Sequence, residues 1–163
     1  MKRINWGIIG LGNIANHHLK SFEKSENCQL KGIASKNSQN LKNFKKKFNI
    51  DDKFCFDNYD DLLKNTEIDI VYIALPNSYH FELINKCIDQ DKHILVEKPI
   101  TENFFQLEKI KNKLLQNQSN VLIYEGFMYK HHPQIKSVLD LVNNNEIGEI
   151  KKIVSNFGIN LLT

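Results

Sequence analysis

Near the start of the chain, an apolar run leads directly into the spacing Gly10-x-Gly12-x-x-Ala15. The first glycine permits a sharp turn, and the second leaves backbone N–H groups bare at the positive end of the next helix, where a pyrophosphate can lie. The small Ala15 lets that helix pack closely on the strand. This strand–turn–helix context favours a dinucleotide pyrophosphate site. The alternative is a plain turn whose glycines serve packing only.

A second polar pair, Ser35-Lys36, stands about where a dinucleotide-binding fold reads the adenosine ribose. An acidic residue there would hydrogen-bond a 2′-hydroxyl and repel a 2′-phosphate. Lys36 could instead donate a charged hydrogen bond to that phosphate, worth about 1.5–3 kcal/mol. The pair therefore predicts NADP in preference to NAD, and the alternative is an ordinary turn lysine.

The segment Glu97-Lys98-Pro99 places a charged pair at the end of an apolar strand, where the proline fixes the turn. A lysine beside a nicotinamide could polarise a carbonyl or pass a proton to the forming alcohol, which predicts a catalytic role for Lys98. The alternative is a surface salt bridge that contributes little to stability. Asn77 and His80 open another helix, and taken alone they fit an N-cap and a satisfied buried histidine.

The elements that must position these residues alternate between strand and helix. Apolar runs predict strands over 5–9, 30–35, 54–56, 68–75, 93–96 and 121–124. Helical spacing of apolar residues predicts a helix after each strand, with Asp57 as the N-cap of the third. This alternation calls for right-handed βαβ units and a parallel sheet covered on both faces. The predicted fold class is α/β, a doubly wound and mostly parallel sheet.

Parallel strands deliver the loops after their carboxyl ends to one edge of the sheet, and ligands bind there. The segments that follow the predicted strands are Gly10 to Ala15, Ser35-Lys36, Pro76-Asn77, Glu97-Lys98-Pro99 and Glu125. Glycine and polar residues from distant parts of the sequence thus collect at one edge. This convergence predicts a single binding site more strongly than any one motif.

The doubly wound pattern is complete near Glu125, which predicts a dinucleotide-binding domain over 1–125. Residues 126–163 then hold one helix, whose apolar face runs from Ile135 to Val142, and a strand predicted over 149–157. These two elements read as a linking helix and the first strand of another domain. A single strand cannot stand alone as a sheet, so it must pair with something else, extend an edge or fray.

Composition argues against several classes of function. The formal net charge of +3 is too small to indicate nucleic-acid binding, and Lys45-Lys46-Lys47 fits a solvated helix face. The three cysteines, Cys28, Cys55 and Cys87, have no metal-ligand spacing, which predicts reduced core thiols, no metal and a cytoplasmic location. No segment fits a signal peptide or a membrane span.

Together these motifs resemble, in order and spacing, the glucose–fructose oxidoreductase / inositol dehydrogenase / MocA family, in particular its dihydrodiol-dehydrogenase-like and sugar-dehydrogenase branch. The resemblance covers essentially the whole chain. The matching segments are Gly10 to Ala15, Ala34-Ser35-Lys36, Leu75-Pro76-Asn77 with His80, Glu97-Lys98-Pro99, and Glu125-Gly126-Phe127-Met128-Tyr129-Lys130-x-x-Pro133. The resemblance implies an N-terminal Rossmann domain and NAD(P)-dependent oxidation of a secondary alcohol on a sugar, polyol or dihydrodiol, or the reverse reduction.

The family's motif residues carry over position by position. The resemblance implies that Lys98 lies near the nicotinamide and the reacting oxygen, and that Pro99 follows a cis bond. Lys36 and Lys130 stand where arginine is usual, which keeps the charge but loses the planar fork. The implied cofactor contacts are Gly10, Leu11, Gly12, Asn13, Ile14, Ser35, Lys36, Leu75, Pro76, Asn77, His80, Glu97, Lys98 and Lys130.

Family members also carry a second α/β domain, which supplies most of the substrate pocket and the usual oligomer interface. This chain stops just inside the first strand of that domain. We therefore expect cofactor machinery with Lys98 present, an incomplete catalytic site, and either a homo-oligomer or a missing C-terminal half. Two other functions stay open: a non-catalytic NAD(P)-binding module or cofactor-sensing regulator, and a different glycine-loop domain such as an S-adenosylmethionine binder.

Overall fold

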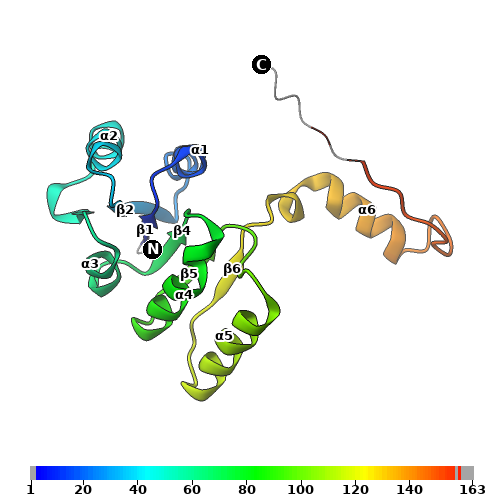
Figure 1. The fold of residues 1–163 in the computed structure, drawn as a ribbon. Helices are drawn as coiled ribbons and strands as arrows, with labels where there is room; N and C mark the ends of the chain where they lie inside the picture. Colours follow the sequence, from blue (N-terminus) through cyan, green and yellow to red (C-terminus); the bar gives the residue numbers. More distant parts are fainter. Residues whose placement is uncertain (1–2, 157, 159–163) are drawn as a thin grey trace. The chain divides into compact units, whose positions relative to one another are not determined.

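The computed structural model describes residues 3–156 and 158. The chain forms two compact units, Met1–Gly126 and Phe127–Thr163. The first unit is built on a six-stranded parallel sheet with the order β3-β2-β1-β4-β5-β6 (Figure 1), which confirms the predicted α/β class. The strands are β1 (Ile4–Ile9), β2 (Cys28–Ala34), β3 (Cys55–Phe56), β4 (Ile70–Ile73), β5 (His93–Val96) and β6 (Ile123–Glu125).

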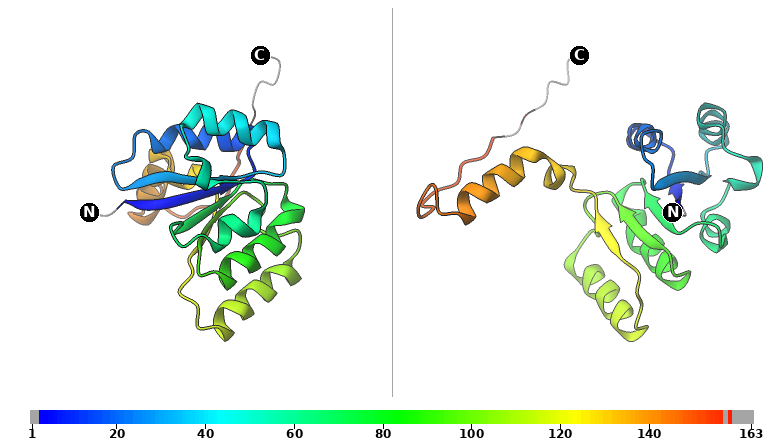
Figure 2. Two further views of the ribbon diagram at one scale, coloured as in Figure 1. Left: turned by 90° about the vertical axis from the view of Figure 1, so that its left-hand side faces the viewer. Right: turned by 180° about the vertical axis from the view of Figure 1, so that it is seen from behind.

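Helices cover both faces of this sheet, as Figures 1 and 2 show. Successive strand residues face opposite layers: Ile8 packs in the cluster that holds Ala15 and Leu19, whereas Ile9 packs in the cluster that holds Leu83. Burial on both faces explains why β1 and β4 read as continuous apolar runs. The helices are α1 (Asn13–Phe22) and α2 (Ser38–Phe48) on one face, and α3 (Tyr59–Lys64), α4 (His80–Asp89) and α5 (Phe104–Gln116) on the other.

A single row of the parallel register runs across the carboxyl ends of all six strands. Each residue of this row pairs with the next in line, so the segments that follow them all leave from one edge of the sheet. The edge carries the glycine turn after β1, the Ser35-Lys36 turn after β2, and the loops after β4 and β5. In spatial order the row is Phe56, Ala34, Ile9, Ile73, Val96 and Glu125.

Two predicted caps are wrong. Asn58 rather than Asp57 caps α3, because the Asn58 side chain accepts a hydrogen bond from the Asp61 N–H at 2.9 Å. Asn77 does not cap α4; it begins a short 3₁₀ helix, Asn77–Tyr79, that leads into α4 without a side-chain cap. Strand β4 is also shorter than the predicted 68–75, because only the middle of that apolar run pairs on both sides.

The second unit contains a 3₁₀ helix, Met128–His131, and α6 (Pro133–Asn143). Helix α6 begins with a proline, and the His132 side chain accepts a hydrogen bond from the Gln134 N–H at 3.2 Å. The strand predicted over 149–157 does not form in the described residues 149–156, and Phe157 lies outside them. A strand needs a neighbour to complete its ladder, and residues 149–156 pair with no strand of the described chain.

Among the described residues, no helix combines the length and the apolar character that crossing a membrane requires. All three cysteines are free thiols. Only Cys87 is buried, while Cys28 and Cys55 are half-buried, so the prediction of core thiols holds for Cys87 alone.

Candidate functional site

The two glycines of the turn after β1 have different surroundings. Gly10 has φ +92°, and a Cβ built there would lie 2.5 Å from the Ala74 carbonyl oxygen, so the fold itself requires a glycine. A Cβ built on Gly12 would meet no protein atom within 4 Å. Gly12 is also the N-cap of α1 and offers no side-chain cap to the N–H groups of the first turn. The loop therefore leaves open space in front of bare donors, which suits a pyrophosphate.

A cavity of about 310 Å³ lies beside this loop, between the first turn of α1 and one side of α2. Asn13 and Asn16 line it from α1, and Asn43 and Lys47 line it from α2. The Lys47 ammonium donates a hydrogen bond to the Asn16 side-chain oxygen at 2.6 Å. Amide groups and a cation next to the open glycine favour an anionic group. Our sequence reasoning placed Lys47 in a solvated lysine run and missed this position.

Ser35 and Lys36 follow β2, the strand that lies next to β1 in the sheet. Ser35 is 6% exposed, and its hydroxyl accepts a hydrogen bond from the Asn37 N–H at 3.1 Å, so it stabilises its own turn. Lys36 is exposed, and its ammonium lies 5.3 Å from the centre of the Tyr59 ring. Lys36 and Tyr59 line a cavity of about 280 Å³ together with Tyr79. The cation thus lies at the edge beside the Tyr59 ring, on the side of the sheet that carries α3 and α4.

Glu97 and Lys98 follow β5. The Tyr72 hydroxyl donates a hydrogen bond to Glu97 Oε1 at 2.6 Å, and the Lys98 ammonium lies 3.6 Å from Glu97 Oε2. The Glu97 side chain is 12% exposed and that of Lys98 is 50% exposed, so this pair differs from an ordinary surface salt bridge. Burial raises the pKa of Tyr72 far above its ordinary value, and the hydrogen bond to Glu97 adds to the shift. The phenol therefore stays a donor.

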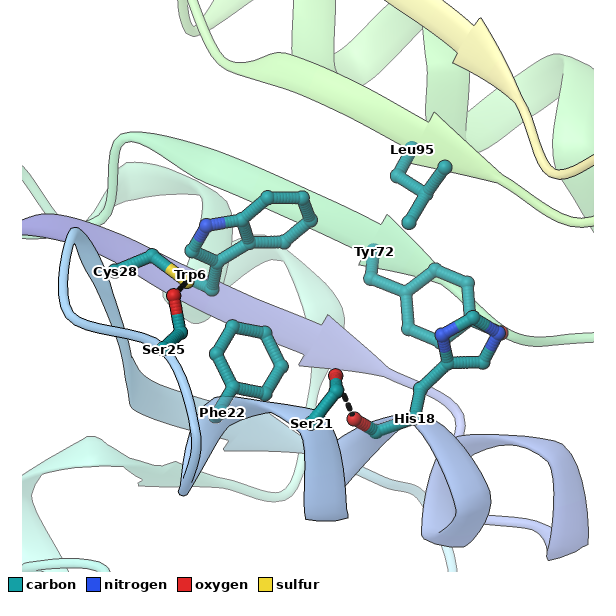
Figure 3. A pocket seen from close by; sticks show the side chains of 8 residues that line it. All are labelled: Trp6, His18, Ser21, Phe22, Ser25, Cys28, Tyr72 and Leu95. Carbon is teal, nitrogen blue, oxygen red and sulfur yellow. Dashed lines mark hydrogen bonds between the residues drawn. The ribbon is translucent and has the colours of Figure 1, made fainter. Parts of the chain in front are cut away.

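A mostly apolar cavity of about 240 Å³ adjoins Tyr72 on the face of the sheet that carries α1 (Figure 3). Trp6 and Phe22 line its far end, with ring centres 5.5 Å apart. Figure 3 shows His18 beside the Tyr72 ring, with 4.8 Å between ring centres. His18 Nε2 is also 3.8 Å from Glu97 Oε1. Nothing in the sequence singled out Tyr72, which reads as one more apolar residue of a buried strand.

The loop after β4 is divided between the surface and the core. Pro76 and Asn77 are exposed at the edge, and Leu75 is half-buried. His80 is only 1% exposed; its Nε2 lies 2.9 Å from the Leu75 carbonyl oxygen and its Nδ1 lies 2.8 Å from that of Pro99. The structure therefore brings Asn77 to the rim and keeps the His80 ring away from it.

The remaining predicted contacts are distributed as follows. Leu11 is buried under the turn, Asn13 is exposed and Ile14 is half-buried on α1. Lys130 belongs to the second unit, where its ammonium lies 5.5 Å from the centre of the Phe127 ring. The bond between Lys98 and Pro99 is cis, as the resemblance implied.

A doubly wound parallel sheet with this strand order, and with a glycine turn leading from β1 into the N-terminus of α1, defines a Rossmann fold. The chain belongs to the oxidoreductase family with an NAD-binding Rossmann fold, whose family model matches residues 4–125. The family suggested by the sequence motifs is thereby confirmed.

Three proteins illustrate what the chain is similar to. It is 32% identical, over 96% of its length, to dTDP-3,4-didehydro-2,6-dideoxy-alpha-D-glucose 3-reductase of Actinomadura kijaniata and covers 46% of that protein. A crystal structure of a 3-ketoreductase from the same organism, with NADP and TDP-benzene, has a TM-score of 0.80 and 32% identity, over 92% of this chain and 45% of the other. Scyllo-inositol dehydrogenase from Lactobacillus casei, with NAD(H) and scyllo-inositol, has a TM-score of 0.83 and 27% identity, over 91% and 43%. The chain thus spans about half the length of these relatives.

Proposed function

We propose that this chain is the cofactor-binding part of an NAD(P)-dependent oxidoreductase that acts on a secondary alcohol, or the matching ketone, of a sugar or polyol. The observation that carries the proposal is the shared edge: the open Gly12 turn leaves β1, and Lys98 leaves β5, along one row of paired strand ends. A dinucleotide laid along that edge would have its pyrophosphate at Gly12 and its nicotinamide toward Lys98. Family membership and the oxidoreductases among the relatives support the reaction class.

In this proposal the backbone N–H groups at the start of α1 bind the pyrophosphate, and Gly12 leaves room for it. The bound cofactor supplies or accepts the hydride at its nicotinamide ring. As the neutral amine, Lys98 would take the hydroxyl proton while the alcohol carbon loses its hydride and would become the ammonium; in the reverse direction the ammonium would return that proton to the oxygen. Glu97, held by Tyr72, keeps the Lys98 side chain at the edge.

We further propose that NADP is preferred to NAD. The residue pair after β2 contains no carboxylate to hold a 2′-hydroxyl or repel a 2′-phosphate, and it offers Lys36 as an exposed cation. Lys47 adds a second cation beside the glycine turn. Both cofactors occur among similar proteins: the 3-ketoreductase structure contains NADP, and the scyllo-inositol dehydrogenase structure contains NAD(H).

Binding is tested first, by titrating the chain with NADPH and NADH. Energy transfer from Trp6, the single tryptophan, to the reduced nicotinamide reports binding. Saturable binding, tighter for NADPH, is expected. Turnover is then tested with NADP and a panel of polyols and sugars, in the direction of NADPH formation. Failure to bind either cofactor would refute the proposal and point to another glycine-loop ligand. Binding without turnover would favour a non-catalytic NAD(P)-binding module.

A further inference from the structure

The four residues that follow β5, Glu97 to Ile100, each make different contacts with the neighbouring elements. Three of them are held by a side chain from another element, while the Lys98 side chain is left half exposed. On the C-terminal side of Lys98, the Pro99 carbonyl oxygen lies 2.8 Å from His80 Nδ1, and the Ile100 N–H donates to Glu125 Oε1 at 2.8 Å. Two successive backbone groups after Lys98 are thus fixed by residues distant in the sequence.

His80 joins two segments of the edge at once. It is the first residue of α4, and its ring is almost fully buried between the Leu75 and Pro99 carbonyl oxygens. Both partners are acceptors and a neutral imidazole carries one N–H, so the neutral ring donates to one of the two carbonyl oxygens while its other nitrogen lies against the second. The ring therefore lies in contact with both the residue before Pro76-Asn77 and the residue after Lys98.

Glu125 holds the same loop from the opposite side. It is the last residue of β6 and pairs in register with Val96, the last residue of β5. The next N–H along the chain, that of Gly126, donates to the Val96 carbonyl oxygen at 2.8 Å. The Glu125 side chain reaches from this paired strand end to the Ile100 N–H, so β6 supports the far side of the turn.

We propose that His80 and Glu125 are positioning residues for Lys98, an inference that rests on the proposed function. Neither side chain is assigned a contact with the cofactor or the substrate in this role. They contact the C=O and the N–H of the Pro99–Ile100 peptide, so that the Lys98 side chain stands where it can serve the reacting oxygen. Proton transfer is sensitive to such placement, because a displacement of about 1 Å can lower a rate about 100-fold. Supporting groups of this kind keep a functional side chain in its productive geometry.

The first test measures amide hydrogen exchange and the side-chain NMR signal of Lys98 in this chain, with that signal assigned by its loss in Lys98→Met. Glu125→Ala removes the acceptor for the Ile100 N–H, whereas Glu125→Gln keeps an acceptor oxygen of the same reach. The alanine variant should speed exchange at Ile100 about tenfold or more and shift the Lys98 signal, while the glutamine variant should stay within about threefold of the unmodified chain. Equal effects of both substitutions would overturn the role of Glu125.

His80→Phe removes both ring nitrogens, and Leu83→Ala serves as its control because Leu83 is buried on the same helix but bonds neither loop. His80→Phe should loosen residues 98–100 selectively, whereas Leu83→Ala should speed exchange across the sheet through lower overall stability. Identical exchange patterns for these two variants would show that His80 only stabilises the core.

The second test uses the substrate that the alcohol panel identifies. Glu125→Ala and His80→Phe should lower kcat about 10- to 100-fold, with KM and NADPH affinity within about threefold, and Glu125→Gln should restore kcat. An unchanged kcat, or an equal loss of NADPH affinity, would overturn the proposal. If the unmodified chain binds NADPH but turns over no substrate, the proposed catalysis fails on its own account. The exchange and Lys98 measurements then still decide whether the two side chains hold this loop.

Discussion

Replacing Gly12 with alanine should separate cofactor binding from folding. The new methyl group would meet no protein atom within 4 Å, and φ of −95° suits any L-residue. Reduced freedom of the unfolded chain stabilises by about 0.4–1 kcal/mol, and a poorer N-cap costs about 0.5–1 kcal/mol. These effects offset each other, so the net change stays within about 1 kcal/mol. We expect Tm to move by no more than about 4 °C.

The same methyl group would occupy the space in front of the first N–H groups of α1. If the pyrophosphate lies there, it must move away from its donors, and NADPH affinity should fall at least tenfold, or about 1.4 kcal/mol. Fluorescence titration measures the affinity, and thermal unfolding measures the stability of the same sample. A Gly12→Ala chain that binds NADPH as tightly as the unmodified chain would refute the assignment of this loop.

Gly10→Ala is the matched control, two residues away. Its methyl group would lie 2.5 Å from the Ala74 carbonyl oxygen, on a residue with φ +92°. The left-handed backbone costs about 1–2 kcal/mol and the overpacking about 1–3 kcal/mol, so stability should fall by about 2–5 kcal/mol. That corresponds to a Tm lower by about 4–20 °C. An unchanged Tm would show that the turn relaxes and that our steric argument fails.

The remaining predictions concern three lysines. Lys36→Asp should weaken NADPH binding by about 1.5–3 kcal/mol and NADH binding much less, by titration; equal losses would remove the argument for NADP. Lys98→Met should lower kcat at least about 100-fold with little change in NADPH affinity, and retained turnover would exclude it as the proton carrier. Lys92 is 7% exposed and donates at 2.8 Å to the Asn65 and Ile68 carbonyl oxygens. Lys92→Met should therefore lower the free energy of unfolding by about 2–4 kcal/mol, measured by urea unfolding. Its control, Lys64→Met at an exposed site, should leave that free energy unchanged. Burial lowers the pKa of Lys92, so the folded chain releases its proton first and the unmodified protein should gain stability over Lys92→Met as pH rises toward 10.5; the opposite trend would contradict this.

The sequence predicted the sheet well because local patterns and topology rules agree there. Apolar runs of strand length alternated with helical periodicities, and only a few connections are compatible with that order. The glycine turn was predictable for the same reason, since Gly10 and Gly12 act through backbone geometry within a few residues. Helix caps were less predictable, because adjacent polar residues such as Asp57 and Asn58 are both competent and the chain path chooses between them.

Contacts along the edge of the sheet were not predictable, because each joins a residue of one strand to a residue that follows another strand. Tyr72 and Glu97 are 25 residues apart, as are Ile100 and Glu125. No periodicity links such pairs; they meet only because β4, β5 and β6 end in one row. The strand predicted over 149–157 was too optimistic for a related reason, since apolar alternation supplies a surface for pairing but not the neighbour.

The lysine run shows where a usable signal was overlooked. Three consecutive lysines on a helix point about 100° apart, so they cannot share one environment. The structure pairs Lys45 with Asp52, leaves Lys46 exposed, and places Lys47 in the cavity beside Gly12. Residues 40, 43 and 47 are spaced as one helical stripe, and 13 and 16 form a matching stripe on the helix that starts at the glycine turn. Helical spacing predicts that the members of each stripe share one face of their helix, and the pairing of β1 with β2 then brings the four asparagines and one lysine together beside Gly12.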